Sequence, residues 1–156
     1  MSQEINRITK ALEGNINGKP WFGNNLHQQL ERMDFKKAII IPEGLNHSIA
    51  EIITHMMAWR QFVIEKLNGN TEYEVWETDL DWVKISSLDN AGWENIITQL
   101  ADNQAILLET INKKAEELLN IKVDSRQYNF RLMLNGIIQH DIYHIGQISI
   151  IRKLVN

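Results

Sequence analysis

The sequence predicts an all-α protein that folds as a four-helix bundle, with one domain over residues 1–156. A length of 156 residues is usual for a single domain. Apolar residues recur at helical spacing over three long stretches of the chain. The only two prolines, Pro20 and Pro42, precede all three stretches, so proline interrupts none of these helices.

The segment before Pro42 predicts two shorter helices that together form the first helical region. One covers about residues 3–12 and ends at the motif GNINGKP, whose glycines and proline are typical of a break. The other covers residues 24–33, where three apolar residues share one face.

A long helix is predicted from residue 48 to residue 67, because its apolar residues step by three and four. A capping residue is expected among residues 46–48, and the tripeptide NGN at 68–70 is a typical stop.

The segment 69–87 contains a tyrosine and two tryptophans among acidic residues and has no clear period. We expect it to be a packed connection between helices, which is favoured over a substrate lid. The third long stretch is predicted to begin at Ser86, since Asp89 three residues later resembles half of a capping box, and to continue to Leu119.

The last helix is predicted over residues 127–154, where isoleucine dominates a wide apolar stripe. The motif VDSRQ that precedes it is a short connection. The third and fourth long helices are therefore expected to be antiparallel neighbours.

The composition excludes several classes of protein. No apolar run reaches the roughly 20 residues that a membrane span requires, and the N-terminal segment lacks a secretory signal, so a soluble cytoplasmic protein is expected. A net charge of -4 without a dense basic cluster argues against nucleic acid as a partner. Since the chain has no cysteine, any metal ion must be bound by nitrogen and oxygen.

Two histidines, His140 and His144, lie four residues apart in the segment QHDIYHIGQ of the last helix. Both fall in its apolar stripe and are predicted to point into the bundle, where this spacing lets two imidazoles bind one ion. Gln147 shares their face. His55 occupies a core position of the helix 48–67 and is predicted to be a third ligand. The alternative is that they are buried histidines that donate to backbone carbonyls.

The remaining histidines and the neighbouring acid are assigned other roles. His47 is predicted to be a solvated cap and His27 an exposed residue of a polar segment. The motif HDIYH resembles the zinc-protease motif HExxH, with Asp141 as a base one methylene shorter. No histidine or acid follows it as a third ligand. Asp141 lies about 100° from the histidine face, so it is predicted to support a ligand or to lie at the surface.

Over nearly its whole length the chain resembles the DinB-like family, also called the YfiT-like metalloenzymes. The motifs that carry the resemblance are GKPWFGNNLHQQL, HSIAEIITHMMAWRQFVIEKLNG, DWVKIS, GWENIITQL and NGIIQHDIYHIGQISIIRK. The last motif is the most specific, because the family's final helix has an HxxxH pattern with aromatic and Gly-Gln residues, matched here by His140, Tyr143, His144, Gly146 and Gln147. The histidine of the family's second helix matches His55.

This resemblance implies an up-down-down-up four-helix bundle, often a homodimer, with a divalent ion on three histidines from two helices. Relatives include thiol-dependent S-transferases and isomerases that use bacillithiol or mycothiol. The leading hypothesis is therefore a metal-dependent S-transferase, with zinc or nickel as the ion and a low-molecular-weight thiol as cosubstrate for a small electrophilic substrate.

Two alternatives stay open. A hydrolase that uses metal-bound hydroxide needs a general base, for which Tyr143, Gln147 and Asp141 are weak candidates. An acid of the segment 69–87 is a further candidate, namely Glu77, Asp79 or Asp81. The second alternative is a non-enzymatic, stress-associated dimer in which the ion ties two helices together.

Overall fold

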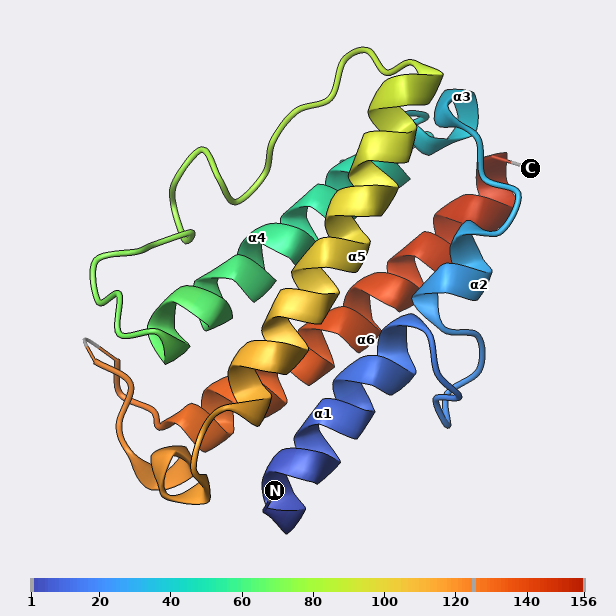
Figure 1. Ribbon diagram of the computed structural model, residues 1–156. Helices are drawn as coiled ribbons and strands as arrows, with labels where there is room; N and C mark the ends of the chain where they lie inside the picture. Colours follow the sequence, from blue (N-terminus) through green and yellow to red (C-terminus); the bar gives the residue numbers. More distant parts are fainter. Residues whose placement is uncertain (1, 125, 156) are drawn as a thin grey trace.

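Four main helices pack as a bundle in the computed structural model, which describes residues 2–124 and 126–155 (Figure 1). They are α1 (Gln3–Ile16), α4 (Ile49–Leu67), α5 (Asn90–Asn112) and α6 (Phe130–Val155). Three short helices lie between them: α2 (Leu26–Leu30), α3 (Phe35–Ala38) and the 3-10 helix η1 (Glu116–Asn120). The described residues form no strand, so the all-α prediction is confirmed. None of these helices is both long and apolar enough to cross a membrane.

The helix directions follow an up-down-down-up order. Figure 1 shows α1 and α6 running one way and α4 and α5 the other, with the segment between α4 and α5 returning along the length of the bundle. Both α1 and α4 pack against α5 and α6. The helices α5 and α6 therefore stand at opposite corners, and the prediction that they are neighbours was wrong. Their connection, residues 113–129, is longer than VDSRQ because it includes η1, and it crosses the end of the bundle.

The predicted ends of the third long helix also need correction. Asp89 caps α5 by accepting a hydrogen bond from the Gly92 amide at 2.8 Å, so the helix begins at Asn90 and Ser86 lies outside it. The helix stops at Asn112, and the apolar periodicity that extended the prediction to Leu119 continues in η1. In the first region, α2 is shorter than the predicted stretch 24–33, and α3 was not predicted.

The start of α4 is held by a complete capping box. The Ser48 hydroxyl accepts from the Glu51 amide, and the Glu51 carboxylate accepts from the Ser48 amide. Glu51 is only 2% exposed, and its second carboxylate oxygen accepts from the Ile85 amide at 3.1 Å. One buried side chain thus fixes both the first turn of α4 and the far end of the α4–α5 connection.

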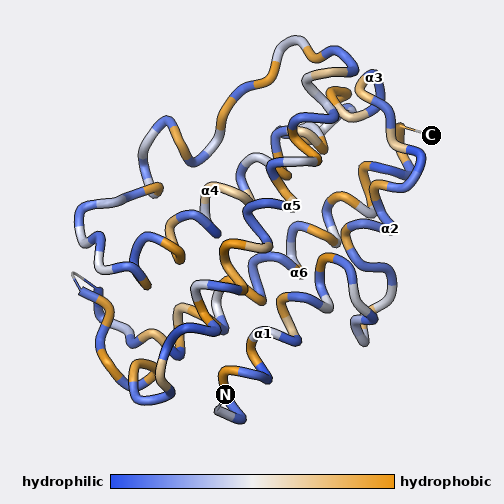
Figure 2. Tube along the Cα trace, in the orientation of Figure 1, coloured by the Kyte–Doolittle hydropathy of each residue, from blue (hydrophilic) through white to orange (hydrophobic). Residues whose placement is uncertain are grey.

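The bundle core divides into two apolar clusters. Figure 2 shows apolar positions recurring along each main helix among hydrophilic ones. One cluster contains the second half of α4 with the first part of α6, and the other contains the first half of α4 with the last part of α6. On each helix a polar group falls between the clusters: Arg60 on α4, Gln104 on α5, Asp141 on α6 and the Leu12 carbonyl on α1.

These polar groups form one buried network that joins all four helices. The Arg60 guanidinium donates two hydrogen bonds to the Asp141 carboxylate, at 3.0 and 2.7 Å, and a third to the Gln104 side-chain oxygen at 3.0 Å. The Gln104 amide nitrogen donates to the Leu12 carbonyl at 3.3 Å. Arg60 and Asp141 are fully buried. The surface role predicted for Asp141 is therefore wrong, because its charge is neutralised inside the bundle.

Replacing one partner of this pair should destabilise the fold strongly. Asp141→Ala leaves the Arg60 guanidinium buried without its counter-ion, which typically costs about 3–5 kcal/mol in the free energy of unfolding. Urea unfolding followed by circular dichroism measures this loss. A double variant, Arg60→Met with Asp141→Leu, removes both charges and should recover most of it.

The matched control is Glu109→Ala, which breaks the exposed Glu109–Lys113 pair on the outer face of α5. It should leave the unfolding midpoint unchanged, because exposed ion pairs contribute little. Equal midpoints for Asp141→Ala and Glu109→Ala would show that the buried network does not stabilise the bundle.

Candidate metal centre

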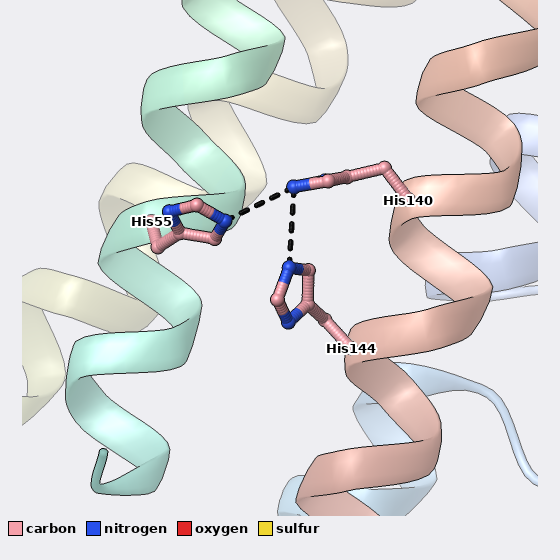
Figure 3. A group of neighbouring side chains, drawn as sticks. All are labelled: His55, His140 and His144. Carbon is pink, nitrogen blue, oxygen red and sulfur yellow. Dashed lines mark hydrogen bonds between the residues drawn. The ribbon is translucent and has the colours of Figure 1, made fainter. Parts of the chain in front are cut away.

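Three histidines from two adjacent helices converge between α4 and α6. The Nε2 atom of His140 lies 3.0 Å from that of His55 and 3.1 Å from that of His144 (Figure 3). The possible ligand atoms of all three lie within 4.8 Å of one another. The predicted inward orientation is thus observed. Their assignment as metal ligands stays a prediction.

Hydrogen bonds behind two of the rings select the nitrogen that faces the centre. The Nδ1–H of His55 donates to the Asp81 carbonyl oxygen at 2.7 Å, with the Asp81 carboxylate at 3.0 Å. The Nδ1–H of His144 donates to the side-chain oxygen of Gln147 at 2.6 Å. Because these oxygens only accept, the proton lies on Nδ1 and the Nε2 lone pair points inward. Among the described residues, the buried Nδ1 of His140 has no hydrogen-bond partner.

Burial keeps the imidazoles neutral. It lowers the pKa of His140 to about 3, with further lowering from the neighbouring His144, His55 and Arg60. Burial also lowers the pKa of His144 to about 4, although the hydrogen bond to Gln147 opposes this shift. The pKa of His55 is lowered by burial too, with Asp81 opposing the change. All three side chains are therefore in the protonation state that binds metal ions.

The donor set fits a divalent cation. Since the Nε2 atoms of His55 and His144 both carry lone pairs, a proton on the Nε2 of His140 can be donated to only one of them, and the other lone pair is left without a donor. A cation satisfies all three. Zinc–nitrogen bonds of about 2.0–2.1 Å at tetrahedral angles place the nitrogens about 3.3 Å apart, close to the observed separations. Imidazole ligands suit zinc, nickel, iron and copper alike.

The α4–α5 connection, residues 68–89, forms one wall of this centre. The Trp82 ring stacks between His55 and His47, with centroid distances of 3.8 and 3.6 Å and nearly parallel planes. The indole N–H of Trp59 donates to the Asp81 carboxylate at 2.9 Å. Of the three acids considered in this segment, the structure brings Asp81 to the site, whereas Glu77 and Asp79 are exposed. The predicted packed connection is therefore also part of the site.

A pocket of about 280 Å³ opens over the histidines. Its lining is mostly aromatic: His55, Trp59, Trp76, Asp81, Trp82, His140, Tyr143 and His144. Asp81 is the only carboxylate among these residues, and its oxygen is engaged by His55 and Trp59. Tyr143 is 63% exposed, and its hydroxyl accepts from the Gln147 amide at 3.1 Å.

The other residues considered for the site lie in different places in the structure. Gln147 supports His144, and Tyr143 lies at the mouth of the pocket, whereas Asp141 pairs with Arg60 and faces away from the centre. His27 is exposed, as predicted. His47 is not a solvated cap, because Ser48 caps α4 and the His47 ring is half-buried against Trp82.

Two neighbours of the histidines were missed by sequence reasoning. Trp59 follows His55 by one helical turn in the same apolar series, so its place beside the site could have been inferred. Trp82 gave no such signal, because its stacking on His55 depends on how the connection folds back over α4.

Comparison with known proteins gives one family. The model of the DinB superfamily matches residues 22–148, a span that includes all three histidines and most of the chain. No curated protein and no solved structure matches.

The stability of the metal-free protein should fall between pH 6.5 and pH 4. In the unfolded chain these histidines titrate near their ordinary pKa of about 6.5, whereas in the fold the pKa values of His140 and His144 are about 3 and about 4. The unfolded state therefore binds more protons in this window, and the stability present above pH 6.5 is lost as the pH falls. Allowing for partial exposure to solvent, each of these two histidines should account for a loss of about 1 kcal/mol from the free energy of unfolding by pH 5.

Urea unfolding of chelator-treated protein at pH 7 and pH 5 measures this difference. The double variant His140→Gln, His144→Gln lacks the two groups and should lose most of the pH dependence, whereas His27→Gln should retain it. An identical pH dependence in the double variant and the wild type would contradict the assignment.

Proposed function

The chain belongs to the DinB superfamily, and we propose that it is a metal-dependent S-transferase that joins a low-molecular-weight thiol to a small electrophile. His55, His140 and His144 are proposed to bind one divalent ion, zinc or nickel. The observation that carries the proposal is the convergence of the Nε2 atoms of three neutral imidazoles beneath an open aromatic pocket. Structural zinc sites usually have four protein ligands, whereas three leave a position for a substrate.

A divalent ion on three neutral imidazoles keeps its positive charge, so it lowers the pKa of a thiol that reaches it and supplies an anionic nucleophile at neutral pH. The chain's own residues orient the ligands. Asp81 and Gln147 hold the rings of His55 and His144 through their Nδ1 atoms. The rings of Trp59 and Trp82 displace water around the histidines and favour a substrate with an apolar or aromatic surface.

The proposed reaction forms one carbon–sulfur bond. The thiol loses its proton to solvent, and its sulfur supplies the electron pair of the new bond to the electrophilic carbon. In a substitution, the leaving group departs with its bonding pair. In an addition to a double bond, the neighbouring carbon takes a proton from solvent. No redox partner is required, and since the chain has no cysteine, the thiol is a cosubstrate.

The pocket favours transfer over hydrolysis. A hydrolase needs a base beside the attacking water. The only carboxylate among the described residues that line the pocket, that of Asp81, already orients the rings of His55 and Trp59 through its Oδ1 atom. Transfer of a thiol requires no such base once its proton is lost.

The metal content of purified, untagged protein tests the site. We expect about one divalent ion per chain in the wild type and in His27→Ala, and none in His55→Ala or His140→Ala, because two remaining ligands hold an ion weakly. Conjugation of glutathione, bacillithiol or coenzyme A to 1-chloro-2,4-dinitrobenzene, followed with and without chelator, tests the reaction.

The outcomes separate the alternatives. Conjugation that persists in both histidine variants would overturn the transferase proposal. Bound metal with hydrolysis of activated esters but no conjugation would favour a hydrolase. A large fall in melting temperature on chelation, without turnover of either kind, would favour a structural ion.

Gln147→Leu should weaken metal binding by about 10–100-fold, because groups that orient a ligating histidine typically contribute this much. The structure motivates the change, since Gln147 is the only hydrogen-bond partner that it gives for the Nδ1 of His144. Competition with a chromophoric chelator measures the affinity. Gln99→Leu on the exposed face of α5 is the control and should bind the ion as the wild type does. Equal metal affinities in the two variants would show that Gln147 does not support metal binding.

A further inference from the structure

A second pocket of about 370 Å³ lies between α4 and α6, directly beside the histidine centre. Two residues, Trp59 and His140, line both pockets. The rest of its lining comes from α4, from α6 and from the segment before α6: Phe62, Val63, Tyr128, Leu132, Met133, Gly136 and Ile137. This pocket therefore adjoins the pocket over the histidines, with Trp59 and His140 in common, and lies toward the start of α6.

The chemistry of the second pocket is almost entirely apolar. Four of its residues, Phe62, Val63, Met133 and Ile137, are buried and belong to the apolar core. None of its lining residues carries a formal charge when His140 is neutral. A charged group would lose part of its hydration there, and no residue of the lining offers it an opposite charge. The lining therefore favours a neutral apolar group, and the volume is in the range of small-molecule pockets.

The Trp59 ring, which lines both pockets, is held by one hydrogen bond and by contacts with two rings. The indole N–H of Trp59 is fixed by the Asp81 carboxylate at 2.9 Å. The Trp59 ring packs edge-on against Phe62 at 5.5 Å and lies 5.9 Å from the His140 ring. Because the two pockets share Trp59 and His140, one ligand with a reactive end and an apolar arm can contact both.

We propose that the second pocket binds the apolar arm of the electrophilic substrate, an aryl or branched alkyl group, while the electrophilic carbon lies over the histidines. The inference rests on the proposed function and adds to it a substrate class: neutral electrophiles with a bulky hydrocarbon arm. The bundle's own core residues supply the selectivity.

Gly136 is the position where the pocket can be closed. It lines the pocket, and a Cβ atom built on it meets no atom within 4 Å, so a larger side chain enters open space. Gly136→Leu should therefore fill the pocket while preserving α6. Gly14→Leu on α1 is the matched control, since a Cβ there also meets nothing within 4 Å and Gly14 is not among the pocket's lining residues.

Binding of 1-naphthalenemethanol, a neutral aromatic probe, tests the pocket without requiring turnover. Protein labelled with ¹³C at the methionine methyls reports the position by NMR. The Met133 resonance should shift on titration, while that of Met33, which packs in the other core cluster, should not. Gly136→Leu should weaken binding at least about tenfold, the effect expected when an apolar pocket is blocked, and Gly14→Leu should bind as the wild type does.

A missing Met133 shift, or equal affinity for the probe in Gly136→Leu and the wild type, would overturn the proposal that this pocket binds the apolar arm. His55→Ala should still bind the probe, because the apolar lining does not include His55. Probe binding in a protein that holds no metal and conjugates no thiol would reject the proposed function and leave the apolar site in place. Metal-dependent conjugation without probe binding would reject the apolar site and leave the proposed function in place.

Cobalt-loaded protein tests whether the two pockets are continuous. With Co²⁺ in place of the native ion, the naphthyl protons of the bound probe should show paramagnetic shifts that are absent with Zn²⁺, because the probe lies against His140. Unshifted probe protons in protein that carries stoichiometric Co²⁺ would place the probe away from the histidine centre and overturn the inference.

Discussion

The buried Arg60–Asp141 pair is the constraint on which the arrangement of this bundle depends. Its two hydrogen bonds fix the register of α4 against α6, and Gln104 extends the network to α5 and α1. Asp141 directly follows His140, and Arg60 lies five residues after His55. A slip of one residue on either helix would turn its side chains by about 100° and move them by about 1.5 Å. The same slip would break the ion pair and separate the histidines, so one interaction maintains both.

The cost of burying this pair is consistent with a role in selecting one alignment of the helices rather than in adding stability. Replacing a buried ion pair by hydrocarbon is often neutral or stabilising, so the pair adds less to stability than its hydrogen bonds suggest. What it adds is a single allowed alignment of α4 against α6, two helices whose apolar faces alone would let them slide past each other. It also places a fully buried cation close to His140, which helps to keep that imidazole unprotonated.

Local patterns were sufficient to predict the two helices that carry the histidines and the direction in which the histidines point. Helical periodicity places His55, His140 and His144 on apolar faces, and the Ser48 cap starts α4 within the predicted range. Features that depend on distant contacts were predicted wrongly or missed. Asp141 looked peripheral because its partner Arg60 is 81 residues away in sequence. His47 looked solvated because Trp82, which covers it, lies in a segment without any period.

The topology explains why that segment reaches the histidines. In an up-down-down-up bundle, α4 and α5 are parallel, so the chain must return along the full length of α4 before α5 can begin. A helix of 19 residues is about 28 Å long, and the returning segment therefore has to pass the level of His55. Glu51 holds its far end to the first turn of α4, and Trp82 then lies against His55. Two antiparallel helices would not need so long a connection. Here the connection forms one wall of the histidine centre. The helices α4 and α6 provide the three nitrogens, and the α4–α5 connection provides Trp76 and Trp82 to the aromatic lining of the pocket above them.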